Sequence, residues 1–155
     1  MAGTLRYRDA TLRVAILPRL CVVRWFDSPQ LHHFPEIVAA MKAAGEGGGA
    51  GLFNVVDGGG KLPSFGGGVR EAASEFAREL TPLSVGAAHI ILVGGLTGTA
   101  VRMFLSTLTL LSRSKAPTTI HTSVADGAAW MAKHLGQGMT TAQIDAVFAL
   151  TDPNS

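Results

Sequence analysis

Short apolar runs alternate with segments of helical periodicity along most of the chain, and this alternation limits the possible folds more than any other feature. Apolar runs of about 4–8 residues are typical of strands. The nearly continuous apolar run "AGLFNVVD" indicates a central strand that is covered on both faces. Pro18 separates the first two runs and marks a turn, because proline cannot donate to a strand ladder. The predicted strands are 12–17, 21–26, 50–57, 87–95 and 117–123.

Helical patterns fill the segments between and after these strands. Ser28 is a suitable N-cap and Pro29 a suitable first helical residue, so the pair predicts a helix start. The predicted helices are 29–44, 69–80, 97–113, 124–136 and 141–150, the last opened by a threonine cap. Strands that alternate with helices are joined by crossover connections, which favour parallel strand neighbours. We therefore predict an α/β fold, with a mixed, mostly parallel sheet flanked by helices.

The predicted domain spans residues 12–150, with an N-terminal arm (1–11) and a C-terminal tail (151–155). The chain has 155 residues, of which 47% are hydrophobic and 15% charged, so the composition excludes intrinsic disorder of the main body. A formal charge of +2 does not favour nucleic-acid binding. We find neither a secretory signal nor a run of roughly 18 apolar residues that could insert into a membrane, and expect a cytoplasmic protein.

Cys21 is the single cysteine of the chain, so it has no intramolecular disulfide partner. It lies in the apolar run "LCVVRWF", and we predict that its thiol is buried as a small hydrophobic group.

Two glycine-rich loops follow predicted strands, at the position where anions bind in α/β sheets. The first, "DGGGKLPS", differs from a phosphate-binding P-loop because Leu62 replaces the required hydroxyl residue and Val55 the leading glycine. The second, "VGGLTGT", lacks the spaced glycines of the dinucleotide-binding pattern. We interpret both as tight turns and predict no cofactor.

The titratable residues show no catalytic or metal-binding pattern. None of the five histidines has typical metal-ligand spacing, and adjacent His32 and His33 would point about 100° apart on a helix. His89 and His121 are interpreted as satisfied polar groups at the ends of strands. Asp57 ends a central strand, but one carboxylate is only half of an acid–base pair. We therefore predict no catalytic residue, no metal ligand and no enzymatic activity.

The element order and the loop after the third predicted strand are similar to the STAS domain of sulfate transporters and anti-sigma-factor antagonists. The chain resembles most the stand-alone, sporulation-antagonist-like branch of bacteria. The resemblance covers about residues 12–136. It rests on the N-terminal strand pair, the strand that ends in Asp57, the serine-bearing loop and the helix "VADGAAWM".

The resemblance implies a regulatory module in which a partner kinase phosphorylates a serine before the second helix. The matching residue is Ser64, which keeps a serine-x-glycine spacing with Gly66, while Pro63 stands where the family usually has aspartate. A phosphate at this helix start would be stabilised by free backbone N–H groups and the helix dipole. The implied partner is another protein, such as a kinase or an anti-sigma-like regulator.

Two surfaces are the candidates for binding this partner or for forming a homodimer. One is the loop 57–68 with the helix after it, and the other is an apolar stripe on the helix 97–113. The stripe either binds a partner or is covered by the helix 141–150, and the sequence leaves both possibilities open. The candidate residues are Asp57, Lys61, Phe65, Arg70, Met103, Thr107 and Leu110.

A second hypothesis belongs to a different class of function. A cleft at the strand ends near Asp57 and Gly94–Gly98 would make the chain a small-molecule, lipid or nucleotide-binding domain, or an enzyme. The expected distinguishing feature is a cavity of a few hundred Å³.

Overall fold

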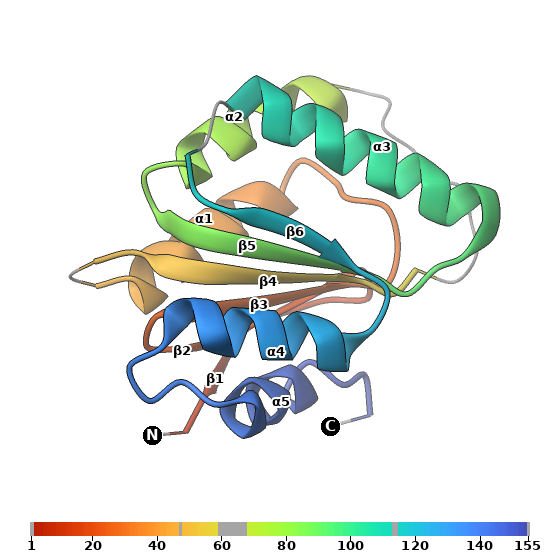
Figure 1. Cartoon of the computed structure of the whole chain (residues 1–155). Helices are drawn as coiled ribbons and strands as arrows, with labels where there is room; N and C mark the ends of the chain where they lie inside the picture. Colours follow the sequence, from red (N-terminus) through yellow and green to blue (C-terminus); the bar gives the residue numbers. More distant parts are fainter. Residues whose placement is uncertain (1, 47, 59–67, 113–114, 155) are drawn as a thin grey trace.

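The computed structural model describes residues 2–46, 48–58, 68–112 and 115–154, with the backbone alone for 108–112. Within these residues six strands form one sheet, in which they follow each other in chain order (Figure 1). The strands are β1 (Thr4–Arg8), β2 (Leu12–Leu17), β3 (Leu20–Trp25), β4 (Ala50–Val56), β5 (Ser84–Ile91) and β6 (Thr118–His121). β1, β2 and β3 are antiparallel neighbours, and β3 to β6 run parallel. The predicted fold class is confirmed.

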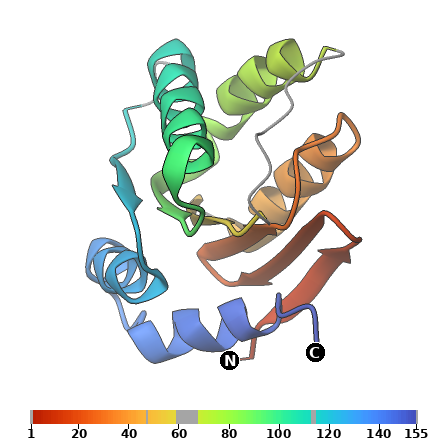
Figure 2. The same ribbon diagram turned by 90° about the vertical axis from the view of Figure 1, so that its right-hand side faces the viewer.

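Five described helices flank this sheet on both faces. They are α1 (His33–Ala44), α2 (Val69–Leu80), α3 (Gly95–Ser112), α4 (Val124–Leu135) and α5 (Thr141–Ala149). The parallel strands advance in one direction across the sheet, so right-handed crossovers place α1, α2 and α3 on the same face. Figure 2 shows these three helices in an arc on one side of the sheet and α4 and α5 on the other. No helix in the described ranges combines the length and apolar character needed to cross a membrane.

Two elements begin differently from the prediction. The predicted arm 1–11 contains β1, a short and mostly exposed edge strand that pairs with β2. The predicted helix start at Ser28 and Pro29 is wrong, because α1 begins at His33 and its N-cap residue His32 makes no side-chain cap bond. A contact between His33 and Asp9, distant in sequence, holds this start in place.

Successive side chains along each strand point to opposite faces of the sheet, and they form two apolar cores, one on each face. On the α1 face, the core includes Cys21, Val23 and Met41. Cys21 is fully buried as predicted, and burial raises the pKa of its thiol to about 12. On the α4 face, Gly127 lets the helix approach the sheet closely, since a Cβ there would lie 2.7 Å from Cγ1 of Ile90.

The helices differ in how closely they approach the sheet. α1 lies on β2 and β3, and α4 lies on β4 and β5. α2 instead packs between α1 and α3, and the described part of α3 approaches the sheet mainly near β5. The centre of the sheet is therefore covered on the α1 face by helices that leave space beneath them.

Candidate functional site

A cavity of about 390 Å³ occupies the space between the sheet and the helices α1, α2 and α3. Its floor is formed by side chains of β3, β4 and β5, including Val23, Leu52 and Ala87. Aromatic and aliphatic side chains of the three helices form its walls and roof. They include Phe34, Ile37, Phe76, Ala77, Val101 and Phe104. The volume falls in the range of small-molecule sites, about 300–1,000 Å³, and the lining is mostly apolar as such sites are.

Three polar side chains on neighbouring strands form a hydrogen-bonded row along the floor of this cavity. Nε1 of Trp25 on β3 donates to Oδ1 of Asn54 on β4 at 2.9 Å. Nδ2 of Asn54 is 3.0 Å from Nδ1 of His89 on β5. Asn54 and His89 are register partners, so their side chains leave the sheet on the same face. We call Trp25, Asn54 and His89 the polar row.

The chemistry of the indole fixes the direction of every hydrogen bond in the polar row. The Trp25 nitrogen is a donor only, so the oxygen of Asn54 must face it and the amide NH₂ must face His89. Nδ1 of His89 therefore accepts, which assigns the ring proton to Nε2. His89 is 8% exposed, and burial lowers its pKa from 6.5 to about 4, so the ring is neutral near pH 7.

The Nε2–H group of His89 is the one donor of the ring not used inside the polar row. No described residue forms a hydrogen bond with this nitrogen. Among the described residues, the fully buried and unpaired side-chain atom is Nε of Arg13, so Nε2 of His89 is not completely enclosed. His89 lines the cavity, so a bound molecule can reach this donor.

The cavity extends to the carboxyl ends of the parallel strands. Pro29 and Gly58 line it beyond the ends of β3 and β4, Val93 lines it just after β5, and Thr97 lines it from the first turn of α3. This position agrees in part with the predicted cleft near Asp57 and Gly94–Gly98. Asp57 itself is not a lining residue.

Asp57 is instead paired with Arg24, whose NH2 nitrogen lies 2.7 Å from Oδ2 of Asp57. The Arg24 guanidinium also lies over the ring of Phe148, 4.6 Å from its centroid, on the α5 side of the sheet. The Asp57 carboxylate thus belongs to a partly buried ion pair, whose Arg24 side chain lies on the opposite face of the sheet from the cavity.

Of the other predicted partner-binding residues, the structure describes the side chains of Arg70, Met103 and Thr107. Arg70 is exposed in the first turn of α2. Met103 is 67% exposed on α3, and the exposed Thr107 donates its hydroxyl proton to the carbonyl oxygen of Met103 at 2.9 Å. Lys61, Ser64 and Phe65, and the side chain of Leu110, lie outside the described residues, so their roles stay predictions.

The helix 141–150 does not cover the exposed stripe of α3, contrary to one of the two predicted possibilities. α5 packs on α4, β2 and β3, on the other face of the sheet from α3 (Figure 1). Its start is the predicted threonine cap: Oγ1 of Thr140 accepts from the backbone N–H of Gln143, and the Gln143 side chain accepts from the Thr140 backbone N–H.

A second hollow, of about 430 Å³, lies at the opposite end of the sheet, near the turn between β2 and β3. Two of its polar side chains, those of Arg19 and His134, already bond to backbone carbonyl groups. Arg19 donates to the carbonyl oxygen of Leu135 at 2.5 Å, and Nε2 of His134 donates to that of Val85 at 2.7 Å. This hollow therefore presents less unused chemistry than the cavity.

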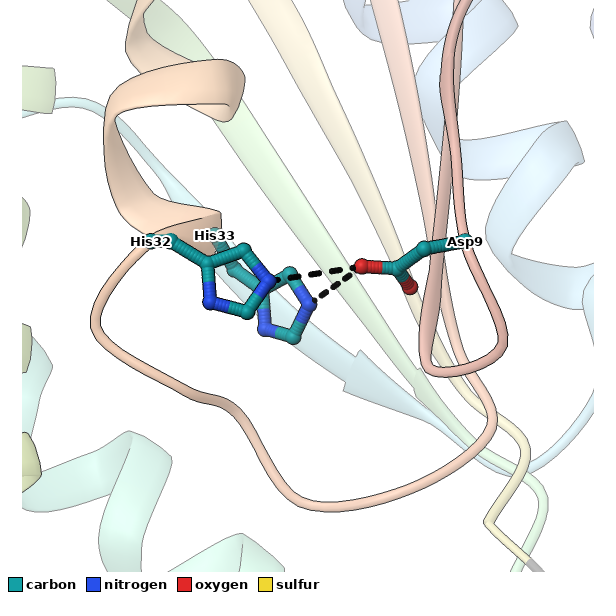
Figure 3. Close-up of side chains that lie close together, drawn as sticks. All are labelled: Asp9, His32 and His33. Atoms are coloured by element: carbon teal, nitrogen blue, oxygen red, sulfur yellow. Dashed lines mark hydrogen bonds and ion pairs between the residues drawn. The ribbon is translucent and has the colours of Figure 1, made fainter.

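Asp9, His32 and His33 form the one cluster in the described residues with the composition of a metal site (Figure 3). Their potential ligand atoms lie within 4.8 Å of one another. The prediction that His32 and His33 point about 100° apart on a helix is wrong, because their ring centroids lie 4.1 Å from each other. α1 begins at His33, so His32 precedes the helix and both Nε2 atoms approach Oδ2 of Asp9, at 3.5 and 2.8 Å.

The hydrogen bonds of this cluster argue against metal binding. Nδ1 of His33 accepts from the backbone N–H of Gln30 at 2.9 Å, so its Nε2 carries the proton that is donated to Asp9. A metal at Nε2 would require loss of that proton and leave an imidazolate. Oδ1 of Asp9 also accepts from Thr11 and Leu12, and Oδ2 accepts from Tyr7, so the carboxylate is fully occupied.

The ionised form of Asp9 is the form that these donors stabilise. Burial opposes ionisation, but the hydrogen bonds from Tyr7, Leu12, His33 and Thr11 outweigh it and lower the pKa of Asp9 well below its ordinary value. The hydrogen bond from the Tyr7 hydroxyl to Asp9 also raises the pKa of Tyr7 to about 12. The cluster is a structural anchor that joins the β1–β2 turn to the start of α1.

Comparisons of the chain with protein-family models, curated proteins and solved structures give no match. The resemblance to STAS domains therefore stays a prediction.

Sequence analysis did not identify the polar row as a site. His89 was expected at the end of a strand, but β5 begins at Ser84 and places His89 in its interior. The useful signal was the presence of Asn54 and His89 inside two predicted central strands that are otherwise largely apolar, since a buried polar side chain needs a partner. The partner itself follows from strand register, which the sequence pattern does not specify.

Proposed function

We propose that this protein binds a predominantly apolar small molecule in the cavity between the sheet and α1, α2 and α3. The observation that supports this function best is a cavity of about 390 Å³ with apolar walls and a buried polar row in its floor. It is roughly two and a half times the volume of an engineered cavity of ~150 Å³ that holds benzene. A few polar groups in an otherwise apolar cleft are the usual composition of ligand sites.

The size of the cavity also argues against a simple packing defect. Protein interiors are close-packed, so unfilled space of this size beneath three helices is unusual in a core. The cavity is also partly open rather than sealed, which gives a small molecule a way in. We therefore interpret it as a site that a ligand fills and not as an unfilled core.

A direct test is the binding of the neutral fluorescent probe N-phenyl-1-naphthylamine, followed by its own emission. The variant Ala77→Phe places a ring in the roof of the cavity and is expected to weaken binding about 10-fold or more, because it removes volume and apolar contacts. Ala39→Phe makes the same change at an exposed position of α1 and is the matched control. Loss of affinity in Ala77→Phe alone supports the site.

Two results would contradict the proposal. One is the absence of saturable probe binding to the wild-type protein, and the other is equal affinity in the two variants. Circular dichroism at the same concentrations verifies that both variants are folded, so that a loss of binding is not a loss of structure.

The regulatory function predicted from the STAS resemblance remains a separate hypothesis. It includes a protein partner, a homodimer, a phosphorylated Ser64 and a cytoplasmic location. The exposed side chain of Met103 is consistent with a docking surface on α3. Mass spectrometry of Ser64 in the native host, with Ser64→Ala as the control, tests it independently of the cavity.

A further inference from the structure

We infer that the ligand of this cavity is an uncharged molecule with a hydrogen-bond acceptor, such as a ketone, ester or amide carbonyl, which accepts a hydrogen bond from the Nε2–H group of His89. This inference rests on the proposed function, because it assigns the chemical class of the molecule that fills the same site.

The polar row presents a donor to the ligand. The chain of bonds begins at the Trp25 indole, which can only donate, and passes through the Asn54 amide to Nδ1 of His89. Reversing the His89 tautomer would place two donors, the Asn54 NH₂ and Nδ1–H, against each other. A ligand that approaches Nε2 therefore meets an N–H group, and its complement is an acceptor.

The donor is held in place before a ligand arrives. Asn54 is 8% exposed and His89 8% exposed, and both stand on adjacent parallel strands in direct register. A pre-oriented donor in an apolar cavity favours ligands with an acceptor over ligands without one, because a ligand without an acceptor buries this N–H group and leaves it unpaired.

The charges around the cavity favour an uncharged ligand over an anion. Among the described lining residues there is no lysine or arginine, and the one carboxylate is that of Asp27. A carboxylate or phosphate in the apolar interior would find no counter-charge among these described lining residues and would lose its hydration. His89 does not supply the counter-charge near neutral pH, since burial lowers its pKa to about 4.

Three naphthalenes of similar size separate these possibilities. 2-Acetylnaphthalene is neutral and carries an acceptor, 2-ethylnaphthalene is neutral and carries none, and 2-naphthoate is an anion. Their affinities are measured by displacement of N-phenyl-1-naphthylamine from the wild-type protein at pH 7. We expect the ketone to bind about 3- to 10-fold more tightly than the ethyl compound, the usual range for one hydrogen bond, and naphthoate to bind most weakly.

The variant His89→Leu removes the donor and keeps an apolar side chain of similar size. In this variant we expect the ketone and the ethyl compound to bind with the same affinity, while the probe still binds. ¹⁵N NMR of the histidine rings in the wild-type protein gives a second readout that does not depend on the variant. It should show a protonated Nε2 and an unprotonated Nδ1 for His89, with the Nε2 signal moving on addition of the ketone only.

The outcomes of the two proposals are distinguishable. Equal binding of the ketone and ethyl compounds to a wild-type protein that binds the probe overturns the acceptor inference and leaves the proposed function standing. Tightest binding of 2-naphthoate, or a protonated Nδ1 in His89, also overturns it. A protein that does not bind the probe at all contradicts the proposed function itself.

Discussion

The side chain of His89 connects the chemistry of the cavity with the stability of the fold. Its ring is buried, and its one described hydrogen bond uses Nδ1 as an acceptor for the Asn54 amide. Protonation of Nδ1 would replace this bond by a contact between two donors and would place a charge in an apolar environment. Both effects favour the neutral ring, in agreement with a pKa that is lowered to about 4, mainly by burial.

We predict that the protein loses stability as the pH falls from 6.5 to 4 because His89 is neutral in the folded state. The unfolded chain, with a pKa of 6.5, takes up a proton in this range that the folded chain does not, so acidification favours unfolding. The loss attributable to His89 between pH 7 and 4.5 should be about 2–3 kcal/mol. Urea unfolding of the wild-type protein and His89→Gln at the two pH values measures it.

The contribution of Asp9 falls in a lower range and does not obscure this measurement. The folded-state pKa of Asp9 is depressed, so its stabilisation is present above the ordinary value of 3.8 and is lost as the pH falls below it. An equal loss of stability in the wild-type protein and in His89→Gln between pH 7 and 4.5 would show that His89 is not buried as a neutral ring.

At the scale of the elements, the Asp9 anchor fixes where α1 begins relative to the first hairpin. Asp9 lies in the turn between β1 and β2, and His33 is the first residue of α1 and 1% exposed. The contact between them replaces the local cap that Ser28 and Pro29 were predicted to provide. Because α1 supplies Phe34 and Ile37 to the cavity wall, the anchor also helps to position one side of the site.

We predict that Asp9→Asn destabilises the fold by about 1–3 kcal/mol, since an amide nitrogen replaces an oxygen that accepts hydrogen bonds. Asp145→Asn makes the same change at an exposed position of α5 and should have little effect. Thermal unfolding measures both. Neither EDTA nor an equivalent of Zn²⁺ should shift the wild-type midpoint, and a clear rise with Zn²⁺ would identify the cluster as a metal site instead.

The sequence predicts the bounds of an element well where its apolar periodicity determines them. It predicts them less well where contacts with residues distant in sequence determine them. The predicted bounds of the helix at 69–80 coincide with α2, whose apolar spacing is regular. β1 was not predicted, because an exposed edge strand carries no buried face to set its pattern. The start of α1 was misplaced because its determinant, Asp9, is distant in sequence.

The site was harder to predict than the elements for a related reason. Val101 and Phe104 lie on the inner side of α3, but helical periodicity predicts only which face turns inward and not how far away the opposing surface lies. In the structure these side chains line a cavity rather than closing onto the sheet. Apolar side chains that seal a core and those that line a ligand site have the same sequence pattern.

At the scale of the whole molecule, the sequential strand order places α1, α2 and α3 on one face and leaves α4 and α5 to cover the other (Figure 2). The two faces are packed differently. On the α4 face Gly127 permits close contact with the sheet, while on the α1 face α2 bridges its neighbouring helices and leaves the cavity below. We propose that the ligand binds on the α1 face, where the cavity lies, while the α4 face is closed by direct packing of its helix on the sheet.

The most direct test of this assignment is a crystal structure of the wild-type protein grown with 2-acetylnaphthalene. We predict that the ring lies between β4–β5 and the helices α2 and α3, with the ketone oxygen at a hydrogen-bond distance of about 2.7–3.2 Å from Nε2 of His89. A structure in which α2 and α3 close directly onto the sheet, or in which ordered water fills the cavity while the compound binds elsewhere, would contradict it.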